Sequence, residues 1–368
     1  MVTFARGACG RVDRAGVNGY RRHRGPALLR ALRPVVRDAG RLAYGRRHGR
    51  RLVDAIRRHD PDVILETHVA FSAGGAHAAA VTGVPLVIDD LAPRWEETTF
   101  GVGLGQAADR VWRRVTDRAR VLVAVNAPIH AELAPDVDDL DKLIVVGNGY
   151  DARWADAGRP RADTRAALGI AADTLVLTFV GSFLPWHRAD LLVTALADVG
   201  IARPWQLLLI GDGPCRTEVA RTVADRGLAD HVTFTGAVPS RHVADHLRAT
   251  DIAVLPATNP YGNPMKLVEY LALGTTVVAP DQTTVTELCT HGETAWLFTP
   301  DSSDALGDAL RTVAADDRLA GRLAGAAAVA AADLRWDRQA ERLVVGMHAA
   351  GIGDARTLEV APAGERST

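Results

Sequence analysis

Lys266 and Glu269 lie three residues apart in a segment that runs from Asn263 to Gly274 and is followed at once by the apolar run 275–280. The pattern predicts a loop, a helix and then a buried strand. Asn263 suits the N-cap position and Pro264 the first helical position, while Gly274 ends the helix. The free N–H groups at a helix N-terminus bind phosphate readily, so the residue types predict an anion site here.

A lysine in the first turn of a helix is locally unfavourable, because it adds a cation to the positive helix end. A bound anion would explain Lys266, which is one of only two lysines in the chain; the other is Lys142. Glu269, one turn later, could accept hydrogen bonds from two sugar hydroxyls. The pair therefore favours a nucleotide-sugar pocket, and the alternative is an ordinary amphipathic helix with solvated charges.

Short apolar runs alternate with helical patterns along most of the chain. We predict strands near 62–66, 84–90, 121–125 and 143–146, and the alternation restarts near Leu175 after a polar stretch from Asp151 to Ala172. Such alternation predicts parallel sheets covered by helices on both faces. The expected fold class is α/β, with two Rossmann-like domains at 1–151 and 172–333, a final helix at 334–350 and a disordered tail at 351–368. Because open α/β sheets bind ligands at the carboxyl ends of their strands, we expect the site in a cleft between the domains.

The composition of the 368 residues is that of a globular protein, with 48% hydrophobic and 24% charged residues and a net charge of −1. This charge gives no nucleic-acid signature. No apolar run approaches the length of a transmembrane helix, and the three cysteines lack metal-ligand spacing. We expect a cytoplasmic protein, and the abundance of alanine and arginine is typical of an actinobacterial genome.

Arginine is concentrated in residues 1–58, where helical spacing predicts a helix over 26–58. A basic amphipathic helix can lie on an anionic membrane, so peripheral membrane contact is one expectation. The alternative is a helix with a solvated arginine face.

Several motifs occur in the order typical of retaining glycosyltransferase family 4, and residues 60–347 resemble that family. The segments that carry the resemblance are Val180–His187, Leu209–Pro214, Val232–Gly236, Thr250–Pro256, Asn263–Gly274, Glu287–Leu288 and Gly292–Thr294. The resemblance implies the B-type glycosyltransferase fold, in which two Rossmann-like domains face each other across a cleft. It also implies that the final helix, after Trp336, returns to the first domain.

The resemblance also implies roles for individual residues. Glu269 would bind the ribose hydroxyls of the donor nucleotide, with a helix-surface glutamate as the alternative. Lys266 and the N–H groups from Met265 onward would hold the diphosphate. The remaining residues expected at the donor site are Gly181, Ser182, Gly211, Gly213, Tyr261, Gly262 and Asn263. Asn148 and Gly149 match a hinge segment and are expected to be structural.

The chain departs from the family where cations are usual. Ser182 replaces an arginine, His187 replaces a lysine, and Tyr261 replaces the first of two glutamates. We expect Lys266, Arg188 and a protonated His187 to act as substitutes and to be the catalytic residues. His187 could equally be a turn residue.

In the first domain, Asp62–His68 and Pro85–Pro93 are similar to segments of one subgroup of the family. Asp89, Asp90 and Glu96 form part of an acidic run after a strand, which would suit an amino-bearing acceptor such as an aminocyclitol. Solvation of a loop is the alternative. No metal or other cofactor is expected. The usual first βαβ unit is not recognisable at the N-terminus, so we expect it to be missing or truncated.

The sequence thus predicts a glycosyltransferase that moves a sugar from a nucleotide-diphosphate sugar to a small-molecule or glycan acceptor with retention of configuration. Natural-product or cell-surface glycan synthesis would be its setting. One rival is a catalytically weak or inactive homologue that binds nucleotide sugars or acts as a partner subunit, which the departures at Ser182 and Tyr261 favour. Another is a nucleotide-sugar 2-epimerase of the same architecture, against which the helix with Lys266 and Glu269 argues.

Overall fold

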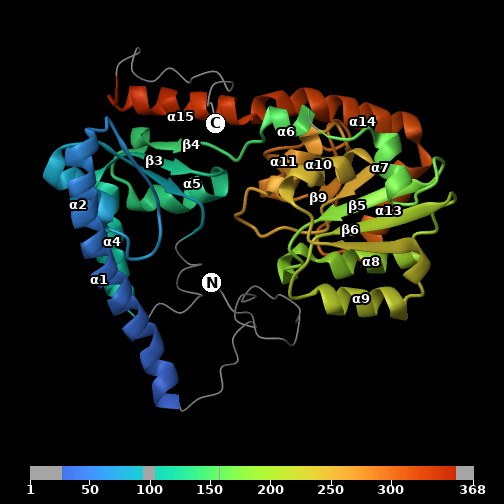
Figure 1. The fold of residues 1–368 in the computed structure, drawn as a ribbon, viewed down its shortest axis with the longest axis horizontal. Helices are drawn as coiled ribbons and strands as arrows, with labels where there is room; N and C mark the ends of the chain where they lie inside the picture. Colours follow the sequence, from blue (N-terminus) through green and yellow to red (C-terminus); the bar gives the residue numbers. More distant parts are fainter. Residues whose placement is uncertain (1–26, 94–103, 157, 354–368) are drawn as a thin grey trace. The chain divides into compact units, whose positions relative to one another are not determined.

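The computed structural model describes residues 27–93, 104–156 and 158–353, and for 27–33 the backbone alone (Figure 1). The described residues form two compact units. We call Asn148–Trp336 the C-terminal unit, and the described parts of 20–147 and 337–353 the N-terminal unit.

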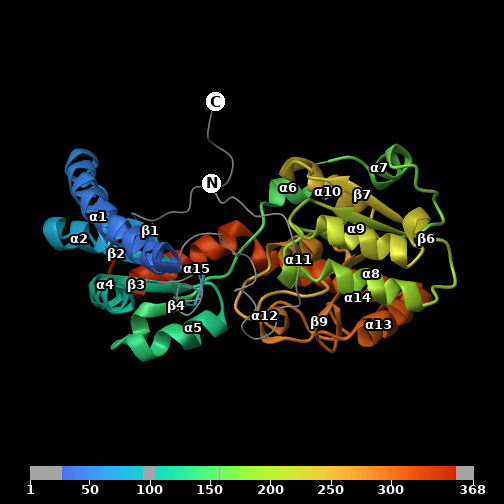
Figure 2. The ribbon, with the colours of Figure 1, turned by 90° about the horizontal axis from the view of Figure 1, so that it is seen from below.

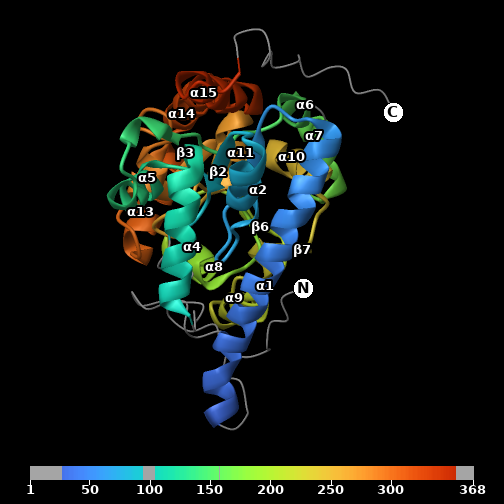
Figure 3. The same cartoon turned by 90° about the vertical axis from the view of Figure 1, so that its left-hand side faces the viewer.

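The N-terminal unit contains a parallel four-stranded sheet in the order β1-β2-β3-β4. Its elements are α1 (Ala27–His59), β1 (Ile64–Thr67), α2 (Gly74–Thr82), β2 (Leu86–Asp90), α4 (Gly105–Arg118), β3 (Ala119–Ala124), α5 (Ala127–Leu133), the 3-10 turns η2 (Ala134–Asp136) and η3 (Leu140–Lys142), and β4 (Leu143–Val145). Each strand predicted from the sequence is present, displaced by at most two residues at its start. On one side of the sheet α1 packs on α2 and α2 on α4 (Figure 3).

The last helix, α15 (Trp336–Ala349), packs on this first sheet (Figure 2). Met347 belongs to a core cluster with Val87, Val121 and Val123. Gly346 allows the close approach, because a β-carbon there would lie 2.4 Å from Cδ1 of Ile144.

The C-terminal unit contains a parallel six-stranded sheet in the order β10-β9-β8-β5-β6-β7. Its strands are β5 (Leu175–Val180), β6 (Trp205–Ile210), β7 (Val232–Gly236), β8 (Ile252–Val254), β9 (Thr276–Pro280) and β10 (Trp296–Phe298). Its helices are α6 (Ala152–Asp156), α7 (Arg161–Ala167), α8 (Ala189–Asp198), α9 (Arg216–Asp225), α10 (Ser240–Arg248), α11 (Met265–Ala272), α12 (Thr283–Thr286), α13 (Ser303–Ala315) and α14 (Asp317–Ala330), with 3-10 turns η4 (Pro185–His187), η5 (Ala229–His231) and η6 (Ala331–Leu334).

Alternate residues of these buried strands contact helices on opposite faces of the second sheet. Leu177 and Leu209 pack in one cluster with residues of α8, α9 and α13. Ala253 and Val277 pack in another with residues of α10 and α11. The two faces agree with the layers in Figure 1, and the unit is therefore doubly wound, as strand–helix alternation predicts.

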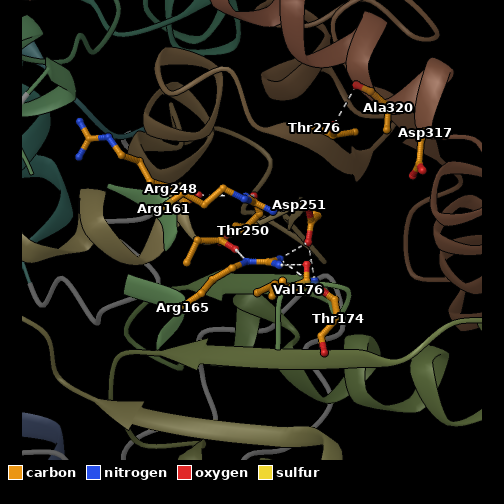
Figure 4. Close-up of polar contacts among 12 residues, drawn as sticks. Arg161, Arg165, Thr174, Val176, Arg248, Thr250, Asp251, Thr276, Asp317 and Ala320 are labelled. Carbon is orange, nitrogen blue, oxygen red and sulfur yellow. Dashed lines mark hydrogen bonds and ion pairs between the residues drawn. The ribbon is translucent and has the colours of Figure 1, made fainter. Parts of the chain in front are cut away.

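An arginine–aspartate network secures α7 to this sheet (Figure 4). Asp251 accepts hydrogen bonds from Arg165 at 2.6 Å, from Arg161 at 2.5 Å and from the N–H of Val176 at 2.7 Å. The remaining donors of the two arginines bond backbone carbonyls, among them that of Thr250. The polar stretch before β5 thus belongs to the C-terminal unit.

Candidate donor site

The donor-site residues expected from the sequence cluster where the second sheet changes direction. The chain passes from β5 to β6 and β7 on one side, and then places β8 on the other side of β5. Such a switch point is where open α/β sheets bind ligands, at the carboxyl ends of the strands. Here the loop after β5 holds Gly181 and His187, and the loop after β8 leads into α11.

The start of α11 differs from the sequence prediction. The helix begins at Met265, and Pro264 is its N-cap with φ −74° and ψ 102° and no side-chain cap. Asn263 therefore does not occupy the N-cap position; its carbonyl instead accepts a 2.9 Å hydrogen bond from the side chain of Asn148. Among the described residues, no acceptor pairs with the N–H groups of Met265 and Lys266. Two donors at the positive end of a helix are therefore open to an anion.

Lys266 and Glu269 are half-buried, and neither side chain makes a hydrogen bond or ion pair with a described residue. Nζ of Lys266 lies 5.6 Å from the ring centroid of Phe179, on β5. Burial lowers the pKa of Lys266 to about 8, although Glu269 opposes the shift. Burial also raises the pKa of Glu269 to about 7, against the influence of Lys266. Both charged groups are thus partly withdrawn from water and gain no hydrogen bond or ion pair from the described residues, as is typical of groups that bind a polar ligand.

The surroundings of His187 disfavour the expected cationic role, which stays a prediction, and its place in the η4 turn fits the alternative of a turn residue. Its imidazole is half-buried, 6.0 Å from the ring of Phe179, and a β-carbon on Gly181 would lie 3.2 Å from its Nδ1. Burial, and then the nearby charge of Lys266, lower the pKa of His187 to about 3. The ring is therefore neutral near pH 7. Its buried Nδ1 has no hydrogen-bond partner in the described part of the chain, so it remains beside the site as a neutral polar group.

Arg188 is occupied by carboxylates. Its Nε lies 3.2 Å from Oδ1 of Asp190, and an Nη lies 3.2 Å from Asp301. Its backbone is left-handed, with φ 46°, because it closes the η4 turn and starts α8. The expected phosphate contact of Arg188 stays a prediction, and it would require these ion pairs to break.

Glycines allow the loops after β5 and β6 to touch through their backbones. A β-carbon on Gly211 would lie 1.9 Å from the carbonyl oxygen of Gly181, and one on Gly213 would lie 1.6 Å from that of Ser182. Gly211 also has φ +123°, which side chains rarely adopt. The expected role of Gly211 and Gly213 in shaping the loop thus has a physical basis, whereas the side chain of Ser182 is exposed.

The loop before α11 is fixed by its own polar contacts. The N–H of Gly262 donates a 2.5 Å hydrogen bond to Oδ1 of Asn259, and the side chain of Gln282 donates to the carbonyl of Asn259 at 3.3 Å. Tyr261 is half-buried, and Met265 is exposed. These contacts set the backbone path into the first turn of α11.

Sequence reasoning missed two residues of the site. Phe179 lies under Lys266 and beside His187, and its only sequence signal is an aromatic residue at the end of a buried strand. The hydroxyl of Tyr270 accepts the N–H of Val180 at 3.0 Å. Tyr270 lies among the apolar residues of the buried face of α11. A tyrosine in such a place is the sequence signal that could have indicated a buried polar contact.

The acceptor residues expected from the sequence lie in the N-terminal unit. Asp89 and Asp90 end β2; Asp89 is half-buried, which raises its pKa, and Asp90 is buried and accepts the N–H of Ala92 at 3.3 Å. Burial of Asp90 contradicts simple loop solvation. Glu96 lies outside the described residues. Nearby Glu66 accepts hydrogen bonds from Ser72 and from the N–H of Gly75 at 2.7 Å, and so secures the start of α2.

One family model matches the part of the chain that contains the candidate donor site. Residues 174–316 match the family of glycosyl transferases group 1. This segment lies within the C-terminal unit and contains β5, β8 and α11. None of the described helices is both long and apolar enough to cross a membrane.

Curated relatives from actinobacteria are similar over a larger part of the chain. The D-inositol 3-phosphate glycosyltransferase of Rhodococcus erythropolis is 30% identical over 67% of this chain and 54% of its own length. A GDP-mannose-dependent phosphatidylinositol monomannoside mannosyltransferase of Mycobacterium tuberculosis is 26% identical over 64% of this chain and 63% of its own length. The chain spans about half the length of the first of these relatives.

Solved structures with the same fold extend the likeness to both units. Anabaena HepE in complex with UDP has a TM-score of 0.70 at 20% identity, covering 82% of this chain and 81% of that one. Sucrose-phosphate synthase from Thermosynechococcus elongatus has a TM-score of 0.64 at 21% identity, covering 80% of this chain and 74% of that one. At these identities the likeness shows the fold: two Rossmann-like domains of the B-type glycosyltransferase architecture.

Proposed function

We propose that this protein is a glycosyltransferase that moves a sugar from a nucleotide-diphosphate sugar to an acceptor hydroxyl or amine, with retention of anomeric configuration. The C-terminal unit binds the donor and the N-terminal unit binds the acceptor. The proposal includes a cytoplasmic location and a carbohydrate or natural-product acceptor. The names of the relatives, with inositol phosphate and mannose chemistry, support the reaction class.

One observation carries the proposal. Lys266 and Glu269 are half-buried charges that make no hydrogen bond or ion pair with a described residue, beside two open N–H groups at the switch point of a doubly wound sheet. A diphosphate satisfies Lys266 and the N–H groups of α11, while ribose hydroxyls satisfy the carboxylate of Glu269. A nucleotide diphosphate therefore supplies both of the missing partners at once.

These groups favour departure of the diphosphate. As the bond between the anomeric carbon and the phosphate oxygen breaks, negative charge grows on the leaving oxygen. Lys266 and the α11 N–H groups are already oriented toward an anion, and preorganised donors of this kind are usually the largest catalytic term. The departing diphosphate then accepts the proton of the acceptor hydroxyl on the same face of the sugar, which yields retention.

A direct test starts from binding. Calorimetric titration with UDP, GDP, ADP and TDP should show one diphosphate that binds saturably and more tightly than its monophosphate. The matching nucleotide sugar should then be consumed with an acceptor, and NMR of the product should show the anomeric configuration of the donor. The absence of binding by all four diphosphates would exclude the donor site.

A second function has specific support. The lowered pKa of His187 makes its ring neutral near pH 7, and Arg188 is paired with Asp190 and Asp301. Two of the cations expected at the diphosphate are therefore not available to bind it in this conformation. This arrangement suits a homologue that binds nucleotide sugars without efficient transfer. Tight binding of a nucleotide diphosphate without transfer from its sugar to any acceptor in a broad panel would favour that alternative.

A further inference from the structure

The N-terminal unit contains a groove between α1, α2 and α4, which pack together on one side of its sheet. The groove encloses about 590 Å³, which is within the range of pockets that hold small organic ligands. The three helices that form it are seen together in Figure 3. The proposed transfer reaction assigns no task to this groove.

The floor of the groove is apolar. Phe71, Ala76 and Val111 are buried beneath it, with exposed fractions of 2%, 7% and 6%, and Leu42 on α1 contributes to one wall. Gly45 brings α1 close, because a β-carbon there would lie 3.0 Å from the carbonyl oxygen of Phe71. A floor of this kind binds a hydrocarbon chain through the hydrophobic effect.

The rim of the groove is strongly basic, and its charges come from two helices. We call Arg46, Arg50, Arg114 and Arg118 the rim arginines. On α1 the spacing is Leu42, Arg46, Arg50, and on α4 it is Val111, Arg114, Arg118. Intervals of three and four residues place side chains on one face of a helix, so each helix presents one apolar residue and two arginines to the same groove.

The rim arginines have no anionic partner within the described ranges of the chain. No hydrogen bond or ion pair joins any of them to a described residue, although Arg37, Arg153, Arg161 and Arg203 all pair with aspartates. Asp117 is the single acidic residue of the lining, against four arginines, and no ion pair joins it to any of them. The groove therefore has an excess of positive charge over an apolar floor.

We propose that this groove binds an amphiphile with an anionic headgroup on a single apolar chain. The rim arginines hold the headgroup, since guanidinium groups suit phosphate and carboxylate oxygens. The floor takes the chain. The ligand is either a free amphiphilic anion or a lipid drawn from an anionic bilayer, and the two sources share this chemistry.

The chain offers a matched control for the charges. Arg47 and Arg51 lie on α1 next to Arg46 and Arg50, are exposed, and do not line the groove. Arg46→Gln/Arg50→Gln and Arg47→Gln/Arg51→Gln remove the same charge from the same helix. General attraction to anions responds equally to both pairs, whereas the groove responds only to the first.

The test uses the full chain without nucleotide and decyl phosphate below its micelle concentration as the probe, in calorimetric titrations. We expect saturable 1:1 binding that weakens about tenfold or more in Arg46→Gln/Arg50→Gln, because charge-assisted hydrogen bonds are lost. Arg47→Gln/Arg51→Gln should bind as the unaltered protein does. Decanol and inorganic phosphate should each bind far more weakly than decyl phosphate.

A second variant tests the floor and does not depend on the arginines. Ala80 is an exposed lining residue on α2, so Ala80→Trp fills the groove without disturbing the core. It should abolish decyl phosphate binding while thermal unfolding and nucleotide binding remain unchanged. Equal weakening by both arginine pairs, inorganic phosphate binding as tightly as decyl phosphate, or normal binding by Ala80→Trp would each overturn the proposal.

Vesicle sedimentation distinguishes the two sources of ligand. Phosphatidylcholine vesicles with phosphatidylglycerol should retain the unaltered protein, and Arg46→Gln/Arg50→Gln should lose more of this retention than Arg47→Gln/Arg51→Gln if a bilayer lipid is the ligand. Equal losses, together with the decyl phosphate difference, assign the groove to a free amphiphile. Glu269→Ala should leave all of these results unchanged, which separates the groove from the donor site.

Discussion

The hydroxyl oxygen of Tyr270 accepts the backbone N–H of Val180 at 3.0 Å. Tyr270 is fully buried on α11, and Val180 is the last residue of β5. This single bond joins the helix that carries Lys266 and Glu269 to the strand that ends in Gly181. A fully buried side chain therefore holds together the two elements that form the candidate donor site.

Tyr270→Phe should destabilise the protein and loosen the donor site. A buried N–H left without an acceptor costs about 1–3 kcal/mol of unfolding free energy, measurable by urea denaturation. Nucleotide diphosphate affinity should also fall. Tyr44→Phe is the control, because Tyr44 is 64% exposed. An unchanged unfolding free energy in Tyr270→Phe would mean that water or a shifted backbone satisfies Val180.

Glu269→Ala should weaken nucleotide diphosphate binding without harming the fold. Hydrogen bonds to a charged acceptor are worth roughly 1.5–3 kcal/mol, and removal of an unpaired half-buried carboxylate relieves a dehydrated charge. Thermal unfolding of the ligand-free variant should therefore be unchanged or raised. Glu132→Ala, at an exposed position of α5, should bind normally. Equal affinity in Glu269→Ala and Glu132→Ala would remove the ribose assignment.

Lys266→Ala should lower turnover more than it weakens substrate binding, because the charge that Lys266 stabilises grows in the transition state. Lys266→Arg should restore activity in part, since guanidinium and ammonium differ in geometry and hydration. Steady-state kinetics distinguish the two effects, with Lys142→Ala as the matched control at the only other lysine. A higher Michaelis constant at unchanged turnover would assign Lys266 to ground-state binding alone.

Binding of a nucleotide diphosphate should take up protons near pH 8–9. The pKa of Lys266 is lowered from 10.5 to about 8, so above pH 8 the native protein binds fewer protons than the unfolded chain. The contribution of Lys266 to the unfolding free energy therefore rises with pH between 8 and 10.5. A bound anion favours the protonated form of Lys266, so the protein takes up a proton when the nucleotide diphosphate binds. Titration calorimetry in buffers of different ionisation enthalpy measures the uptake, which should vanish in Lys266→Arg.

His187 should not titrate between pH 5 and 8 in the ligand-free protein. Its pKa of about 3 results first from burial and only then from Lys266, so the ring should stay neutral in Lys266→Ala as well. Nitrogen-15 NMR of the imidazoles, with the signal assigned by His187→Gln, provides the measurement. A midpoint near 6.5 would restore the cationic role expected from the sequence.

Local patterns predicted much of this structure. The alternation of strands and helices predicted both parallel sheets. The ordered motifs predict that Gly181, Gly211 and Glu269 share one donor site, which stays a prediction. Caps were less predictable: Asn263 and Pro264 both suit a helix start, Pro264 is the N-cap, and the carbonyl of Asn263 accepts a hydrogen bond from the distant Asn148.

Long-range surroundings explain the remaining differences. The charge of His187 depends on burial beside the ring of Phe179, which lies eight residues earlier in the sequence. It also depends on the ammonium of Lys266, which lies far later in the sequence. Arg188 pairs with Asp301, a partner that no local pattern identifies. The sequence did not predict the groove for the same reason, since Leu42 and Val111 line one groove only after α1 and α4 have packed on α2.

The contact between Gly211 and Gly181 limits how this protein can be redesigned. The position of a β-carbon on Gly211 is already occupied by the carbonyl oxygen of Gly181, and that on Gly213 by the oxygen of Ser182. A library that varies either glycine would displace the two loops from each other, and so disturb the candidate site instead of altering donor preference alone. The side chain of Ser182 is exposed on the first of these loops, whereas that of Asp212 accepts a 2.8 Å hydrogen bond from the N–H of Gly213 and helps to hold the second. Engineering of nucleotide selectivity should therefore begin at Ser182.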